Sequence, residues 1–267
     1  MLIVKKTISQ FLFLIILFSA SYSGAAAPIV KPANNLGKAT QLLFVGNSHL
    51  YYNDSLHNHV RRMVIKIDKE NKKKYKYKAA MISGAYLDHH NMSSYLTPGQ
   101  LGLKNPYHYI IMQDNGSTSL TEDKKKRHLK TVKDFSQKIR EAGSLPVIYM
   151  MHAYVSPHKK ADPKMVKKND DFYVMSGNKI NALVIPVALA FEEAYRQNPK
   201  IKLHKYYDGL HPDLLGTYLA AATVFESIYG VSSVGNAYDY FGKISSKDKL
   251  FLQKVANKTV TSFFNRK

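Results

Sequence analysis

The sequence predicts a single α/β domain with three layers, α/β/α, built around a mainly parallel five-stranded sheet. Short apolar runs alternate along the chain with longer segments whose apolar residues recur at helical spacing, which is the order expected of a parallel sheet covered on both faces. The chain has 267 residues, of which 45% are hydrophobic and 12% aromatic. That is enough for one sizeable core, and nothing in the sequence requires a second domain.

Five short apolar runs are the expected strands. They span residues 41–45 (QLLFV), 75–82, 108–112 (HYIIM), 146–151 (PVIYMM) and 182–187 (ALVIPV). In an open parallel sheet, ligands bind beyond the carboxyl ends of the strands. The residues that directly follow these runs are therefore the first candidates for a functional site.

Helices are expected between and after these strands, where apolar residues recur at intervals of three and four. In one of them, Leu129, Val132, Phe135 and Ile139 share a face, and Gly143 ends the helix. The expected helices start at about residue 54 and span 121–142, 188–197 and 213–229, with a final surface helix in 243–267.

The first 27 residues have the order of a secretory signal peptide. Lys5 and Lys6 are followed by an uninterrupted apolar run at 11–18 and then by small residues up to Ala27. The run is short for a membrane span, so we expect cleavage and a secreted or periplasmic protein; an uncleaved anchor is the alternative. Residues 28–39 read as a linker, and the predicted domain spans 40–267. The chain has no cysteine, which excludes disulfides, thiol catalysis and a lipid-anchored N-terminus.

The formal charge is +20, and much of it lies in three lysine-rich patches at 66–78, 124–133 and 158–168. We interpret these patches as solvated surface, with attraction of anionic glycans as the alternative. They lack the clustered arginines and alternating aromatics of a nucleic-acid reader, so no nucleic-acid partner is expected. No stable membrane span is expected either.

Polar residues that could carry out chemistry follow the expected strands. Ser48 comes directly after the first strand, in Gly-Asn-Ser-His, and Asp208 and His211 stand together in Asp-Gly-Leu-His-Pro before a helix. A hydroxyl nucleophile needs a base, and the base needs a carboxylate to orient it. Ser48, His211 and Asp208 supply all three. Each motif alone is more often a plain turn or helix cap, but their order after successive strands favours catalysis.

These segments resemble the conserved blocks of the SGNH/GDSL-like hydrolases. FVGNSHLYYND at 44–54 is similar to the first block, with Asn47 where the name-giving pattern has Asp, and DGLHPDLLGTYLAA at 208–221 is similar to the last. Within that superfamily the sequence is most like a poorly characterised bacterial subgroup with GNS-x-x-YYN and DG-x-HP blocks. The resemblance implies a flavodoxin-like sheet, the catalytic triad Ser48, Asp208 and His211, and no cofactor.

The same resemblance implies an oxyanion hole formed by Ser48, Gly84 and a side-chain donor. The third block departs from the usual Gly-x-Asn-Asp, because this chain has Gln113-Asp114-Asn115. A glutamine occupies this place in the subgroup, so the donor is expected to be Gln113, with Asn115 in reserve. Removing such a donor costs on the order of 3 kcal/mol.

The implied activity is that of a secreted serine esterase that hydrolyses ester bonds through an acyl-enzyme, with O-deacetylation of a carbohydrate or polysaccharide as the expected reaction. Two alternatives remain: a non-catalytic glycan- or polyanion-binding protein on the same fold, and a lipase or thioesterase. No metal is expected, because the spacing of the histidines matches no zinc signature. The histidines considered are His49, His89, His90 and His152.

Overall fold

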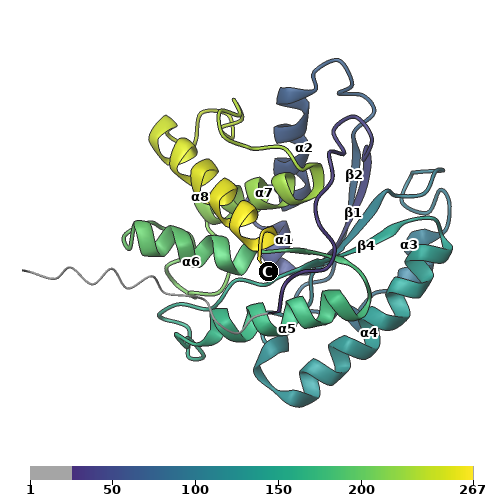
Figure 1. The fold of residues 1–267 in the computed structure, drawn as a ribbon, viewed down its shortest axis with the longest axis horizontal. Coiled ribbons are helices and arrows are strands. Elements are labelled where there is room, and N and C mark those ends of the chain that lie inside the picture. Colours follow the sequence, from purple (N-terminus) through teal and green to yellow (C-terminus); the bar gives the residue numbers. More distant parts are fainter. Residues whose placement is uncertain (1–25, 267) are drawn as a thin grey trace, which may run out of the picture.

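The computed structural model describes residues 26–266 and shows a five-stranded parallel sheet with helices packed on both faces (Figure 1). The strand order is β2-β1-β3-β4-β5, and every pair of neighbours is parallel. This confirms the predicted fold class. The strands are β1 (Gln41–Gly46), β2 (Lys76–Met81), β3 (Tyr109–Met112), β4 (Leu145–Tyr149) and β5 (Leu183–Ile185).

The centre of the sheet is buried on both faces. In β1, Leu43 pairs with Lys78 of β2 and with Ile110 of β3, and residues 42–45 are fully buried. A strand that helices cover on both sides has no solvent face, so its sequence reads as a continuous apolar run without alternation. Strands β1 and β3 are parallel neighbours in this buried part of the sheet. Their carboxyl ends therefore lie side by side at one edge of a rigid core.

The helices form two layers. One face is covered by α3 (Met92–Leu96), α4 (Glu122–Glu141) and α5 (Met165–Lys179), and the other by α2 (Leu56–Ile67) and α7 (Leu214–Tyr229), with α6 (Val187–Gln197) in contact with α5 and α7. The short helix α1 (Ser48–Tyr51) and the 3₁₀ turns η1 (Leu87–His89) and η2 (Thr118–Leu120) follow strand ends or precede helices. Figure 1 shows α4 and α5 across the sheet from α2, α7 and α8.

The last helix is more than a surface element. Helix α8 (Ser246–Phe264) packs along α7 and α6 and buries Leu252, Val255, Ala256 and Phe263. Because α8 covers its outer side, every residue of α7 from 216 to 229 is buried. This explains why α7 is rich in alanine and other apolar residues around its whole circumference.

Helix α5 was not expected from the sequence. Its charged stretch KKNDD at 167–171 interrupts the apolar spacing, and two of these polar residues are buried. Asn169 donates to the carbonyl of Met151 at 2.6 Å, and Asp170 pairs with Arg266 at 2.9 Å. Partners from distant segments satisfy these groups, so a local pattern could not reveal the helix.

The segment expected as a linker, 28–39, has no helix or strand but is attached to the domain. Asn35 donates to the carbonyl of Ile228 at 2.9 Å, and the N–H of Gly37 donates to the Tyr75 hydroxyl at 2.9 Å. The predicted signal peptide, except its last two residues, lies outside the described residues. Among the helices described in 26–266, none combines the length and apolar character needed to cross a membrane.

Candidate active site

Ser48 sits where β1 turns into α1. The strand ends at Gly46, and Asn47 caps the helix by accepting a hydrogen bond from the N–H of His49 at 3.2 Å. The Asn47 side chain also donates to the carbonyl of Ala85 at 2.9 Å, which holds the segment after β2 against the turn. Ser48 is thereby fixed at the carboxyl edge of the sheet, where the sequence predicted it.

The turn depends on Gly46 because a side chain from the neighbouring strand fills the space beside it. A Cβ atom at position 46 would lie 2.3 Å from Oε1 of Gln113. That same oxygen accepts the backbone N–H of Asn47 at 2.9 Å. The glycine therefore lets the Gln113 amide reach under the turn and support the segment that carries Ser48.

Ser48, His211 and Asp208 form a continuous chain of hydrogen bonds. The Ser48 hydroxyl lies 2.8 Å from Nε2 of His211, and Nδ1 of His211 lies 2.7 Å from Oδ2 of Asp208. The other oxygen of Asp208 accepts the N–H groups of Leu210 and His211, at 2.8 and 3.0 Å. Burial alone would raise the pKa of Asp208, but the hydrogen bonds from His211 and from these two amides lower it overall. The carboxylate is therefore charged at neutral pH and can hold the imidazole in one tautomer.

Gly209 allows the Asp208–His211 turn to pack closely on the segment after β4. Its φ is +60°, and a Cβ atom there would lie 2.0 Å from the carbonyl oxygen of Val155. The Gly209 carbonyl accepts the N–H of Val155 at 2.9 Å. His152 adds a second link, since its Nε2 bonds the Leu210 carbonyl at 2.9 Å. The turn is thus anchored to the β4 end of the sheet.

The His211 ring packs against two other rings. The Tyr52 ring centroid is 4.5 Å away, and the His49 ring is stacked at 5.3 Å with an interplanar angle of 28°. Burial, with smaller contributions from His152 and His211, lowers the pKa of His49 well below its usual value. His49 is therefore neutral at pH 7. Of these three rings, only His211 is hydrogen-bonded to a carboxylate, that of Asp208.

A cavity of about 260 Å³ opens at the Ser48 hydroxyl. Its wall is mixed, with hydroxyl, amide and aromatic groups around Ser48. The lining residues are Asn47, Ser48, His49, Tyr51, Tyr52, Ser83, Gly84, Asn115, Tyr154, Leu210 and His211. A reacting carbonyl in this cavity would meet the serine, the imidazole and the amides of two loops at once.

Asn115 faces this cavity, and its orientation is fixed. Its Oδ1 accepts the N–H and the hydroxyl of Ser117, at 3.1 and 2.8 Å, which directs the amide nitrogen the other way. That nitrogen donates one of its two N–H groups to the carbonyl of Gly84, at 3.3 Å, and Gly84 is the residue expected to supply a backbone donor. Gly84 has a φ of +67°, a conformation that glycine adopts without strain. Asn115 and Gly84 thus lie side by side at the cavity wall.

Gln113 lies elsewhere. It is 1% exposed, does not line the cavity, and bonds Asn47 through its oxygen. Its amide nitrogen donates to the carbonyl of Asp114 and to Sδ of Met151. Both ends of the amide are thus engaged beneath the Ser48 turn. The expectation that Gln113 supplies the oxyanion donor does not fit this placement outside the cavity lining, whereas the reserve residue Asn115 lines the cavity.

Asp114, between these two residues, organises the loops behind the cavity. Its Oδ1 accepts the N–H of Leu87 at 2.9 Å and of Asn115 at 2.7 Å, and its Oδ2 lies 2.8 Å from Nδ1 of His128 on α4. Burial would raise its pKa, but the hydrogen bond and charge of His128, with the two backbone amides, lower it overall. One buried carboxylate therefore joins the loops after β2 and β3 to a core helix.

Two lining residues had no signal beyond their position. Tyr154 comes from the loop after β4, and Ser83 from the loop after β2. Inspection of every strand end could have included Tyr154, because it comes five residues after Tyr149, the last residue of β4. The sequence carries no motif there that distinguishes it from other loop tyrosines.

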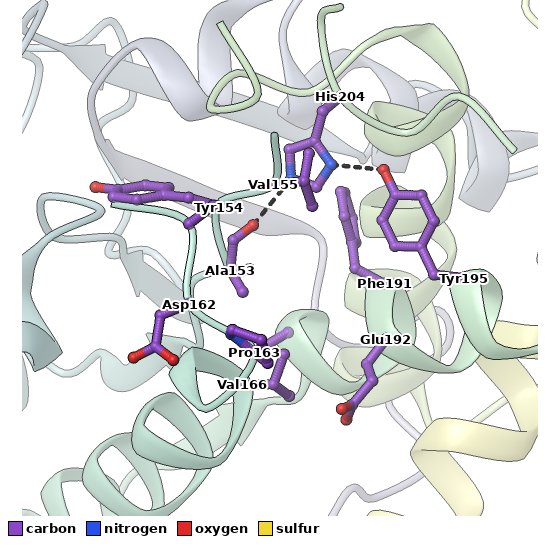
Figure 2. A pocket seen from close by; sticks show the side chains of 12 residues that line it. Ala153, Tyr154, Val155, Asp162, Pro163, Val166, Phe191, Glu192, Tyr195 and His204 are labelled. Carbon is purple, nitrogen blue, oxygen red and sulfur yellow. Dashed lines mark hydrogen bonds between the residues drawn. The ribbon is translucent and has the colours of Figure 1, made fainter. Parts of the chain in front are cut away.

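A second cavity of about 290 Å³ shares Tyr154 with the first and has a mostly apolar wall. Figure 2 shows the His204 ring there, bonded to the carbonyl of Ala153 and the hydroxyl of Tyr195, beside the Phe191 ring. Ser48, His211 and Asp208 do not line this second cavity.

The four histidines considered as metal ligands do not converge. The rings of His49 and His152 meet edge to face at 5.2 Å, whereas His89 contacts Arg127 and His90 contacts Tyr95. No group of three or more His, Asp or Glu side chains in the described part of the chain is placed to hold a metal ion.

The fold is that of the SGNH/GDSL-like hydrolases, as comparison with solved structures shows. A DUF4886 family protein from Bacteroides uniformis aligns with a TM-score of 0.66 and 17% identity, over 85% of this chain and 96% of that chain. A protein from Slackia heliotrinireducens assigned to the SGNH hydrolases aligns with a TM-score of 0.57 and 22% identity, over 71% and 98%. The acetyl xylan esterase AlAXEase aligns with a TM-score of 0.53 and 14% identity, over 70% and 99%.

These likenesses establish the architecture. Neither a family model nor a curated protein sequence matches the chain.

Proposed function

We propose that this protein is a serine hydrolase that cleaves ester bonds through an acyl-enzyme, with Ser48 as the nucleophile. The observation that carries the proposal is the unbroken contact from the Ser48 hydroxyl to His211 and on to Asp208, at 2.8 and 2.7 Å. A nucleophile, a base and an orienting carboxylate within hydrogen-bond reach are the parts that acyl transfer needs. A protein that only binds glycans would have no use for this arrangement.

The first half of the reaction forms the acyl-enzyme. Nε2 of His211 takes the proton of the Ser48 hydroxyl while Oγ attacks the ester carbonyl, and Asp208 stabilises the imidazolium that results. Collapse of the tetrahedral intermediate breaks the bond between the carbonyl carbon and the alcohol oxygen. That oxygen receives from His211 the proton that His211 took from Ser48. The alcohol leaves, and the acyl group remains on Ser48.

Water completes the cycle. It enters where the alcohol left, gives a proton to His211 and attacks the acyl carbonyl. The second tetrahedral intermediate then releases the carboxylic acid, and the Ser48 oxygen regains its proton from His211. Both intermediates carry a negative oxygen, so both need the same donors.

We assign those donors to the backbone N–H groups of Ser48 and Gly84 and to the side-chain amide of Asn115. All three residues line the cavity. One N–H of the Asn115 amide donates to the Gly84 carbonyl, and the second N–H is the one we assign to the oxyanion. Fixed donors stabilise charge more than mobile water does, because they need no reorganisation as the charge develops. In this proposal Gln113 supports the turn and is not a donor.

The substrate class we propose is an O-acetylated carbohydrate, met outside the cell. A cavity of about 260 Å³ with hydroxyl and amide groups around the serine suits a short acyl group on a polar alcohol. The N-terminal pattern at residues 1–27 supports export, and the solved acetyl xylan esterase shares the fold.

A lipase or thioesterase is the second candidate, and one observation favours it. The apolar cavity of about 290 Å³ meets the first at Tyr154 and offers room for an apolar group. Comparing 4-nitrophenyl acetate with the octanoate ester separates the two, since a short-acyl esterase prefers the acetate.

The test of the activity itself is hydrolysis of 4-nitrophenyl acetate by the wild type, by Ser48→Ala and by Ser93→Ala. Ser93 is an exposed serine on α3 that does not line the cavity, so its variant controls for the loss of any serine. We expect Ser48→Ala to lose turnover and Ser93→Ala to keep it. Full activity in Ser48→Ala would reject the proposal.

A further inference from the structure

Four tyrosines gather at the mouth of the Ser48 cavity from two distant segments. Tyr51 and Tyr52 end α1 and line the cavity, and Tyr206 and Tyr207 directly precede Asp208. Because Ser48 bonds His211 and His211 bonds Asp208, the residue after Tyr207, the two pairs are brought to the same side of the cavity. Burial raises the pKa of Tyr52, and the nearby Tyr207 side chain adds to this shift. We call these four residues the tyrosine rim.

The tyrosine rim presents its rings to solvent. Tyr206 is 88% exposed, the highest value among the large apolar side chains of the described residues, and Tyr207 and Tyr51 are 56% and 38% exposed. Single exposed aromatics are ordinary on protein surfaces. A contiguous group that continues into a cavity is not, and such patches mark binding sites.

The rings within each pair have different relative orientations. Tyr51 and Tyr52 are almost parallel, at 5.5 Å and 11°, whereas Tyr206 and Tyr207 are at 81° with the same separation. The Tyr51 hydroxyl is fixed by a 3.2 Å bond to Ser83 Oγ. The rim therefore offers flat apolar faces together with phenolic hydroxyls that can donate and accept.

This combination matches a sugar ring. A pyranose has C–H groups that pack on an aromatic face and hydroxyls around its edge that need hydrogen-bond partners. A fatty acyl chain has no such groups, and it would require an enclosed apolar groove where this surface is open and lined with hydroxyls. Stacking and hydroxyl contacts also need no charge on the ligand, so the rim is suited to a neutral glycan.

We infer that the tyrosine rim binds the sugar residues of an O-acetylated neutral polysaccharide and presents the acetyl ester to Ser48. This inference rests on the proposed esterase function and adds the surface that selects the substrate. Tyr52 connects the two roles, since its ring also packs on His211 at 4.5 Å. The outer residues, Tyr206 above all, act on the sugar alone.

Binding is tested without catalysis. Ser48→Ala protein is titrated with acetylated xylan oligosaccharides by calorimetry in about 1 M NaCl, where the Debye length is about 3 Å and the lysine patches are screened. Adding Tyr206→Ala should weaken binding by about tenfold, the scale of one lost aromatic contact. Tyr206→Phe should retain most of it. Phe241→Ala is the matched control and should change nothing, because Phe241 is an exposed aromatic in the segment between α7 and α8, outside the tyrosine rim.

Kinetics give the second readout. In otherwise wild-type protein, Tyr206→Ala should lower the ratio of kcat/KM on acetylated xylan to kcat/KM on 4-nitrophenyl acetate by about tenfold, mainly through KM. An unchanged ratio and unchanged binding would overturn the inference. It would also be overturned if Tyr206→Ala released the protein from phosphatidylcholine vesicles while leaving xylan binding intact. If the wild type hydrolyses neither ester but binding still depends on Tyr206, the proposed function falls and the sugar site stands.

Discussion

The side-chain oxygen of Gln113 accepts the backbone N–H of Asn47 at 2.9 Å, which joins the end of β3 to the turn that carries Ser48. The contact is possible because Gly46 has no side chain, since a Cβ atom there would lie 2.3 Å from this oxygen. A residue that the sequence suggests as an oxyanion donor thus supports the turn that carries Ser48.

Gln113→Ala should act mainly on stability. The substitution leaves the buried N–H of Asn47 without its partner and opens space beneath the turn, so we expect a loss of about 1–3 kcal/mol in the free energy of unfolding. Chemical denaturation measures this, with Gln100→Ala on an exposed loop as the control. A fall in kcat of about a hundredfold at unchanged stability would return the donor role to Gln113.

Asn115→Ala should act mainly on catalysis. If the amide nitrogen contacts the negative oxygen only as it develops, kcat should fall by about a hundredfold or more while KM changes little. Asn115→Asp keeps an oxygen for Ser117 but has no donor, so it should be at least as inactive. Steady-state kinetics on 4-nitrophenyl acetate measures both effects. Full activity in both variants would contradict this assignment.

Asp114 should contribute to acid sensitivity. Its pKa is lowered in the folded protein, so its contribution to stability is complete above the unfolded value of about 3.9 and is lost as pH falls through the lower folded value. Asp114→Asn should therefore be less stable at pH 7, by about 1–3 kcal/mol, and should lose less stability on acidification below about pH 4.

Denaturation at a series of pH values measures both effects of the Asp114 substitution. Asp134→Asn on the exposed face of α4 is the matched control. An Asp114→Asn protein with the wild-type slope of stability against pH would show that this carboxylate does not carry the effect.

Gly209→Ala should disturb both stability and activity. The new Cβ would meet the Val155 carbonyl oxygen at 2.0 Å, and the φ of +60° is itself strained for alanine by about 1–3 kcal/mol. Since the turn holds Asp208 and His211, we expect a lower Tm together with a reduced kcat. Gly235→Ala is the comparison, because Gly235 also has a positive φ but has open space around its Cβ position. Equal effects of the two substitutions would mean that strain, and not the contact with Val155, is responsible.

Much of the architecture could be predicted because it depends on local pattern. The buried strands are short apolar runs, and Ser48, Asp208 and His211 follow strands or precede a helix in the order that parallel topology requires. The structure brings these three side chains together. The sequence does not show which side chain after β3 faces the cavity. Whether it is Gln113 or Asn115 depends on the space left by Gly46 on another strand.

Other parts had no local signal. Helix α5 buries Asn169 and Asp170 against partners 18 and 96 residues away, so its polar sequence does not look like that of a packed helix. The tyrosine rim exists only because the Ser48 and His211 segments meet. Such relationships arise from tertiary contacts, which a single sequence does not display.

Covalent labelling with a fluorophosphonate tests the central claim most directly, because the reagent modifies a serine only when a base and an oxyanion site activate it. After labelling and proteolysis, mass spectrometry should find one adduct, on Ser48. The adduct should be absent in Ser48→Ala and form much more slowly in His211→Ala, since His211 lies 2.8 Å from the Ser48 hydroxyl. Labelling of another serine, or none in folded wild-type protein, would contradict the account.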